Sequence, residues 1–160
     1  DPIDVANLVK TTLNIEREIS RYHLVVQMAQ LGADAVDPLN YAPYWDGWEG
    51  QQSGSHVMMI NGIDDTTTSN RAMTALMTAG DVPTVGEPAW DVDPSGLRDN
   101  PTTSLPVQGN RESLSGDPLT MLSVTSGSNG HFTLYRNTTA RSRALEFWTS
   151  SLEGVPKVEE

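Results

Sequence analysis

Apolar residues near the N-terminus follow a helical spacing. They recur every three or four positions over residues 3–14 and again from Ile15 to Ala33, which predicts a short helix followed by a longer one that is apolar on two faces. Two prolines then interrupt residues 37–45, and residues 46–55 are rich in Gly, Gln and Ser. Both stretches are therefore expected to form turns and loops.

Two later segments are continuously apolar. His56–Asn61 and Leu119–Thr125 have the pattern of strands that are covered on both faces. Helical spacing follows each of them, over residues 69–79 and 137–152. This alternation predicts an α/β fold with a mostly parallel sheet flanked by helices. Because two strands leave both edges of such a sheet open, further strands are expected from a missing N-terminal segment or a partner chain.

The remaining segments lack a clear period. Residues 81–118 hold six of the ten prolines and are interpreted as a long ordered insertion that passes near the functional cleft. Residues 154–160 are polar and are expected to form a frayed tail. The expected organisation is a helical cap or lid over residues 1–36, a core over residues 37–153, and this tail.

The composition of the chain limits the kinds of ligand and environment that fit it. The 160-residue chain has a formal net charge of −11 and only two lysines, which argues against nucleic acid as a ligand. No stretch is long and apolar enough for a membrane span, and no cysteine is present. An acidic, lysine-poor surface is typical of a secreted or periplasmic protein, and the Asp1-Pro2 start is interpreted as the end of a processed chain.

An acid and a histidine follow the two predicted strands at equivalent points. Asp65 comes three residues after Gly62, and His131 comes directly after Gly130. Because sites in parallel sheets lie beyond the carboxyl ends of the strands, both side chains are expected at one edge. A histidine oriented by a carboxylate is the pair that activates an alcohol nucleophile. Asp65 is the favoured acid, and Asp64 is the alternative.

These motifs carry a family resemblance. Gly62-Ile63-Asp64-Asp65 and Gly130-His131-Phe132, each after a strand, resemble the C-terminal part of an α/β-hydrolase, and residues 37–42 resemble the connector of secreted bacterial lipases and esterases. The resemblance implies a Ser-His-Asp triad in the chain order Ser, Asp, His, with Asp65 and His131 as two members. It implies a serine hydrolase acting on small-molecule esters, with an amidase or peptidase as the alternative, and no cofactor.

The nucleophile of such a triad is not recognisable. The chain has no Gly-x-Ser-x-Gly motif, and neither Ser53-Gly54-Ser55 nor Gly127-Ser128-Asn129-Gly130 has the required strand-to-helix setting. The serine and the oxyanion hole are therefore expected on an N-terminal segment or a companion chain, as in a heterodimer. The competing hypothesis is a non-catalytic α/β interaction subunit that retains the Asp–His pair.

Two further groups are candidate sites. Residues 91–99 place oxygen ligands in the spacing of the front of a calcium loop, although Thr102 stands where a bidentate glutamate belongs. A structural Ca²⁺ is one interpretation, and an acidic solvated loop is the other. An aromatic group either lines a substrate pocket or packs the connector against the core; its members are Tyr41, Tyr44, Trp45 and Trp48.

Overall fold

A four-stranded parallel sheet, in the order β1-β7-β2-β3, organises the fold. The computed structural model describes residues 5–12, 14, 23–127 and 130–159. The strands of the sheet are β1 (Val57–Gly62), β7 (Met121–Ser126), β2 (Thr84–Val85) and β3 (Thr102–Thr103). The predicted α/β class, with a parallel sheet flanked by helices, is confirmed.

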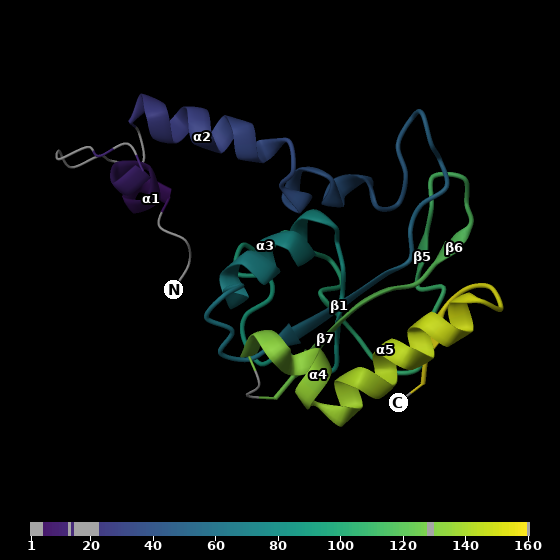
Figure 1. Cartoon of the computed structure of the whole chain (residues 1–160). Helices are drawn as coiled ribbons and strands as arrows, with labels where there is room; N and C mark the ends of the chain where they lie inside the picture. Colours follow the sequence, from purple (N-terminus) through teal and green to yellow (C-terminus); the bar gives the residue numbers. More distant parts are fainter. Residues whose placement is uncertain (1–4, 13, 15–22, 128–129, 160) are drawn as a thin grey trace.

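Helices cover both faces of the sheet. α3 (Asn70–Ala79) follows β1 and α5 (Thr138–Ser151) follows β7, and the two lie on opposite sides of these strands in Figure 1. Successive side chains of a strand point to opposite faces, so each strand contributes to two cores. The buried residues are Met59, Met77, Val82 and Val92 on the α3 side, and Val107, Leu122, Val124, Phe147 and Val158 on the α5 side.

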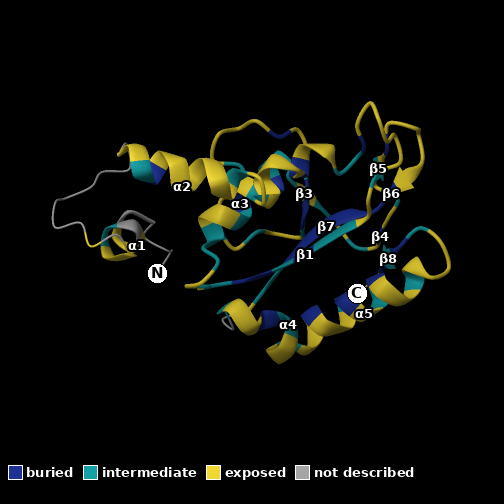
Figure 2. Ribbon diagram, turned by 45° about the horizontal axis from the view of Figure 1, so that its top comes forward, coloured by how far each residue is buried: buried dark blue, intermediate teal, exposed yellow. Residues whose placement is uncertain are grey.

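Polar side chains fix where these two helices begin. The Oγ of Ser69 accepts a hydrogen bond from the Ala72 amide, and the Oδ1 of Asn137 accepts one from the Ala140 amide. Such N-caps satisfy amides that have no partner within the helix. Burial is concentrated in β7 and along the inner side of α5, whereas α2 (Leu24–Asp34) is largely exposed (Figure 2).

The segment over residues 81–118 differs from its prediction. It supplies β2 and β3, which extend the sheet beyond β7, together with the short strands β4 (Val107–Gln108) and β5 (Arg111–Glu112). The expectation that this chain supplies only two strands to the sheet is therefore wrong. Strands of two residues escape detection because they are too short to show a period of two.

The C-terminal tail also differs from its prediction. β8 (Lys157–Val158) pairs antiparallel with β4, and the Val158 side chain is fully buried. Val158 packs with Val107 and Phe147, and Pro156 is also fully buried, so apolar burial helps to hold the tail against the core. The prediction of a frayed tail is wrong for residues 154–159.

The other elements are short or lie near the N-terminus. Of the helix predicted over residues 15–33, residues 15–22 lie outside the described part of the chain. None of the described helices is long and apolar enough to cross a membrane. The remaining elements are α1 (Val5–Thr12), η1 (Pro38–Asn40), η2 (Ala42–Tyr44), β6 (Pro118–Leu119), η3 (Gly130–Phe132) and α4 (Thr133–Arg136).

Candidate active site

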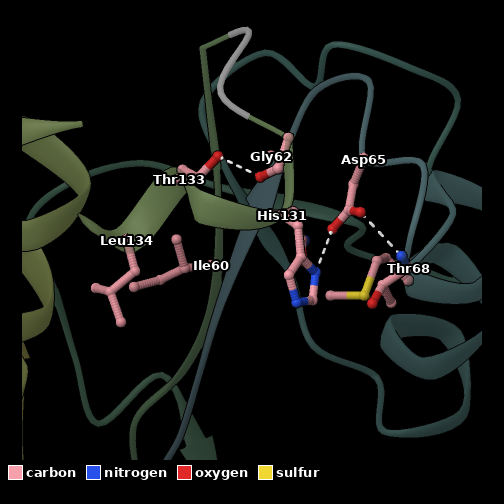
Figure 3. Close-up of a pocket in the computed structure, with 10 residues that line it drawn as sticks. Ile60, Gly62, Asp65, Thr68, His131, Thr133 and Leu134 are labelled. Atoms are coloured by element: carbon pink, nitrogen blue, oxygen red, sulfur yellow. Dashed lines mark hydrogen bonds and ion pairs between the residues drawn. The ribbon is translucent and has the colours of Figure 1, made fainter. Parts of the chain in front are cut away.

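The structure brings Asp65 and His131 together. β1 and β7 pair in parallel from Val57↔Met121 to Gly62↔Ser126, so their carboxyl ends meet at the same edge of the sheet. The Nδ1 atom of His131 lies 3.2 Å from the Oδ2 atom of Asp65 (Figure 3). The side chains predicted to converge from the two strands therefore do so.

Backbone contacts hold the two loops in register. The Ile63 amide donates to the Gly127 carbonyl (3.1 Å), and the Gly130 amide donates to the Ile63 carbonyl (3.2 Å). Gly62 fits against the second loop because it lacks a side chain: a Cβ there would overlap the Gly130 carbonyl oxygen and the Thr133 hydroxyl. Gly130 has φ +52°, a conformation that glycine adopts readily.

Asp65 is held as a carboxylate. Its Oδ1 accepts hydrogen bonds from the amides of Thr67 (2.7 Å) and Thr68 (2.9 Å), which leaves Oδ2 for His131. Burial of the carboxyl group acts to raise its pKa, but the Thr68 and Thr67 amides, together with His131, outweigh this effect and lower the pKa below its usual range. A fixed negative charge therefore faces the imidazole.

The orientation of His131 leaves one ring nitrogen available. Its side chain is 48% exposed, and in the neutral ring a proton on Nδ1 donates to Asp65 while the Nε2 lone pair stays unprotonated. The Phe132 ring packs edge-on against the imidazole, with 5.5 Å between the centroids. The Arg136 guanidinium lies over the Phe132 ring, 5.1 Å from its centroid. The imidazole is thus contacted by the Asp65 carboxylate and by the Phe132 ring.

The geometry also distinguishes the two candidate acids. Asp64 is exposed and has φ +61°, and its carboxylate is not the one that contacts His131. Asp64 therefore forms the turn that carries Asp65 toward the histidine. Of the two carboxylates, Asp65 is the one in a position to orient the imidazole.

A hollow of about 160 Å³ adjoins the pair. The described residues that line it include no serine or cysteine. Ser53 and Ser55 precede β1 and so lie toward the opposite end of the strand, while Ser128 falls outside the described residues. The hollow is lined by Ile60, Asn61, Gly62, Asp65, Thr68, Met73, Gly130, His131, Thr133 and Leu134.

Asn61 is a lining residue that the sequence prediction treated only as part of an apolar strand. It is 1% exposed, and its Nδ2 donates to the Ser123 hydroxyl (2.7 Å), whereas its Oδ1 has no hydrogen-bond partner among the described residues. A buried acceptor without a partner is costly. A lone amide at the end of an otherwise apolar strand was the available sequence signal.

The other candidate groups lie outside this hollow. The Asp93 carboxylate accepts hydrogen bonds from the amides of Leu97 (3.0 Å) and Arg98 (3.1 Å), so it organises its own loop. No metal-ligating cluster of three or more His, Cys, Asp or Glu residues occurs in the described part of the chain. None of the four connector aromatics lines the hollow, and Trp45 packs against Gly80 and the core on the α3 side. The 81–118 segment contributes no lining residue either, contrary to its predicted position near the cleft.

The surroundings of Asp65 and His131 are thus defined by two parallel strands and the loops that follow them. Thr133 closes the second loop by donating from its hydroxyl to the Gly130 carbonyl (2.8 Å).

Comparison of the chain with protein-family profiles, with curated proteins and with solved structures found no match.

Proposed function

We propose that this chain supplies the acid and the base of a serine hydrolase that acts on carboxylic esters. The observation that carries the proposal is the Asp65–His131 contact at the carboxyl ends of two adjacent parallel strands. A histidine whose Nδ1 faces a fixed carboxylate has its Nε2 free for proton transfer. The resemblance of the two strand-end motifs to those of α/β-hydrolases supports the same assignment.

The chemistry assigned to the pair is general base and then general acid catalysis. Nε2 of His131 accepts the proton of a serine hydroxyl as its oxygen attacks the ester carbonyl. The resulting imidazolium is stabilised by the Asp65 carboxylate and then donates its proton to the leaving alcohol. Water repeats the cycle on the acyl-enzyme, which releases the carboxylic acid and regenerates serine.

The nucleophile and the oxyanion hole are assigned to a companion segment or chain. The absence of a serine or cysteine from the described lining of the hollow supports this division. The free Nε2 and the 48% exposure of the His131 side chain leave the imidazole accessible to an incoming hydroxyl. An amidase or peptidase would use the same pair, so the ester substrate rests on the resemblance alone.

Active-site labelling tests the proposal. The coding region of this chain is expressed with its adjoining coding sequence, and the product is treated with a fluorophosphonate, which reacts with activated serines. We expect labelling that is lost in His131→Ala and retained in His23→Ala, because His23 caps α2 and does not line the hollow. Turnover of p-nitrophenyl esters rather than the matching anilides would identify an esterase.

Two results would contradict the proposal. Labelling that survives His131→Ala would show that the serine is activated by another base. No labelling, in material whose intact mass includes every encoded segment, would instead favour a non-catalytic interaction subunit that retains the Asp–His pair.

A further inference from the structure

The outer edge of β1 is unpaired. β1 lies at one end of the strand order, and its only strand partner in the described chain is β7. The Val57 amide donates to Thr120 on the β7 side (2.9 Å), so the alternation of the backbone directs the amides and carbonyls of Met58 and Ile60 outward. None of these four groups is hydrogen-bonded to another described residue. They form a template for one more strand.

This edge differs from the opposite edge of the sheet. β3 has two residues, both threonine, and so presents little backbone for pairing. β1 is six residues long, mostly apolar, and continuous with two helix-covered faces. Soluble proteins usually shorten or charge an edge strand, whereas β1 is long and carries no charged residue. The β1 edge therefore offers more unpaired backbone than the β3 edge does.

The hollow beside the Asp–His pair lies at the carboxyl end of β1. Ile60 and Asn61, whose side chains point to opposite faces of β1, both line it, as do Met73 of α3 and Leu134 of α4. No residue of β7 contributes to the lining. The hollow therefore lies at the carboxyl end of β1, where a strand added beside β1 would also end. Figure 3 shows Ile60 and Leu134 next to each other below Thr133, on the side of the site away from Asp65.

We infer that the β1 edge receives a parallel, apolar strand from the companion segment, and this inference rests on the proposed function. Every pair in the four-stranded sheet is parallel, and helices cover both faces, as in sheets whose strands all run the same way. A parallel strand ends beside the carboxyl end of β1, where Asp65 and His131 lie. Its following loop can therefore reach the Nε2 atom of His131.

A second copy of the chain does not meet this requirement. Two copies that paired through β1 about a two-fold axis would run antiparallel. The amino end of the partner strand, preceded by His56, would then lie at the active-site edge. No hydroxyl-bearing loop would be delivered to His131 by that arrangement.

Amide hydrogen exchange tests the edge directly. In the chain alone, we expect the amides of Met58 and Ile60 to exchange about 100-fold faster than those of Met59 and Asn61, which face β7. In the product expressed with its adjoining coding sequence, all four amides should be similarly protected. Fast exchange of Met58 and Ile60 in that complete product would overturn the inference. Protection that rises with concentration of the chain alone would identify the second copy as the occupant.

Two proline variants separate edge pairing from folding. Ile60→Pro removes an amide that has no partner in the described chain, and proline is tolerated at strand edges. We expect the isolated variant to fold, whereas the complete product loses the protection of Met58. Met59→Pro is the matched control, because it removes an amide that faces β7 and should unfold the chain. Retained protection of Met58 in a folded Ile60→Pro product would contradict the inference.

Different measurements test the direction of the added strand and the catalytic assignment. Nuclear Overhauser contacts between Hα atoms across the β1 edge would show an antiparallel strand and overturn the parallel assignment. Protection of Met58 and Ile60 without fluorophosphonate labelling would leave the strand in place and reject the hydrolase. Labelling that depends on His131, with unprotected edge amides, would reject the strand and retain the hydrolase.

Discussion

Gly62 and Gly130 are in direct backbone contact across the ends of two neighbouring strands. A Cβ on Gly62 would overlap the Gly130 carbonyl oxygen, and the overlap cannot be relieved by rotating a side chain because the obstacle is backbone. The contact therefore sets how closely the loop that carries Asp65 approaches the loop that carries His131. The Ile63 hydrogen bonds on either side hold that spacing.

Gly62→Ala is expected to lower the free energy of unfolding by about 3 kcal/mol, because the added methyl group must displace the His131 loop. Urea denaturation of the chain measures the loss. Gly32→Ala is the matched control: a Cβ there has no neighbour within 4 Å, and Gly32 lies inside α2, where alanine is preferred. Equal stability of Gly62→Ala and the parent would show that the two loops are not in contact.

Asp65→Asn is expected to disturb the tautomer of His131 without unfolding the chain. An amide can donate as well as accept, so it no longer requires the proton on Nδ1. ¹⁵N chemical shifts of the imidazole should show the Nδ1-protonated form in the parent and a mixture in the variant. In the complete product, hydrolysis should fall by about 10³–10⁴-fold, as when the orienting carboxylate of other triads is changed to an amide.

Asp64→Asn is the control for that experiment. Asp64 has φ +61°, which asparagine tolerates well, and the substitution removes the same charge one residue away. We expect the His131 tautomer and the activity to change little. A larger loss in Asp64→Asn than in Asp65→Asn would reverse the assignment of the acid.

The sequence alone was sufficient to predict the long helices and strands and the approach of Asp65 and His131. β1, α3, β7 and α5 follow from apolar runs and helical spacing that extend over several residues, and parallel pairing then brings the ends of β1 and β7 to one edge. The choice between Asp64 and Asp65 required the three-dimensional structure, because the side chains of adjacent residues in a turn point in different directions. The contact between the Oδ2 atom of Asp65 and the Nδ1 atom of His131 decides it.

The missed elements are those that tertiary packing alone stabilises. β2 consists of Thr84 and Val85, and Thr84 pairs with Ser123, so the strand forms because β7 offers a free edge. No local pattern in a proline-rich segment predicts pairing with a distant strand such as β7. Asn61 was missed for a related reason: its burial and its bond to Ser123 depend on the neighbouring strand.

His56 makes the stability of the chain dependent on pH. Its Nδ1 accepts a hydrogen bond from the Thr120 amide (3.1 Å), and partial desolvation lowers its pKa below the ordinary value of 6.5, although the residue is exposed. The folded state therefore favours the neutral ring more than the unfolded state does. The contribution to stability is complete above pH 6.5, decreases as the pH falls through that value, and levels off below the folded-state pKa.

Urea midpoints measured between pH 7.5 and pH 5 should fall for the parent chain and fall less for His56→Asn, whose side-chain oxygen can still accept from Thr120. The same slope in both proteins would assign the pH dependence to other groups.

The C-terminal strand provides the last prediction. Val158 is fully buried among Val107 and Phe147, so Val158→Ala leaves a cavity in the α5-side core and should lower the free energy of unfolding by about 2 kcal/mol. Leu152→Ala is the matched control, because Leu152 is 86% exposed and its truncation should change stability by about 0.5 kcal/mol or less. Urea denaturation compares the two variants with the parent. If both behaved like the parent, β8 would not be packed in solution. A loss confined to Val158→Ala would show that the Val158 side chain helps to hold the tail, because its burial removes it from water while the pairing with β4 satisfies the adjacent backbone.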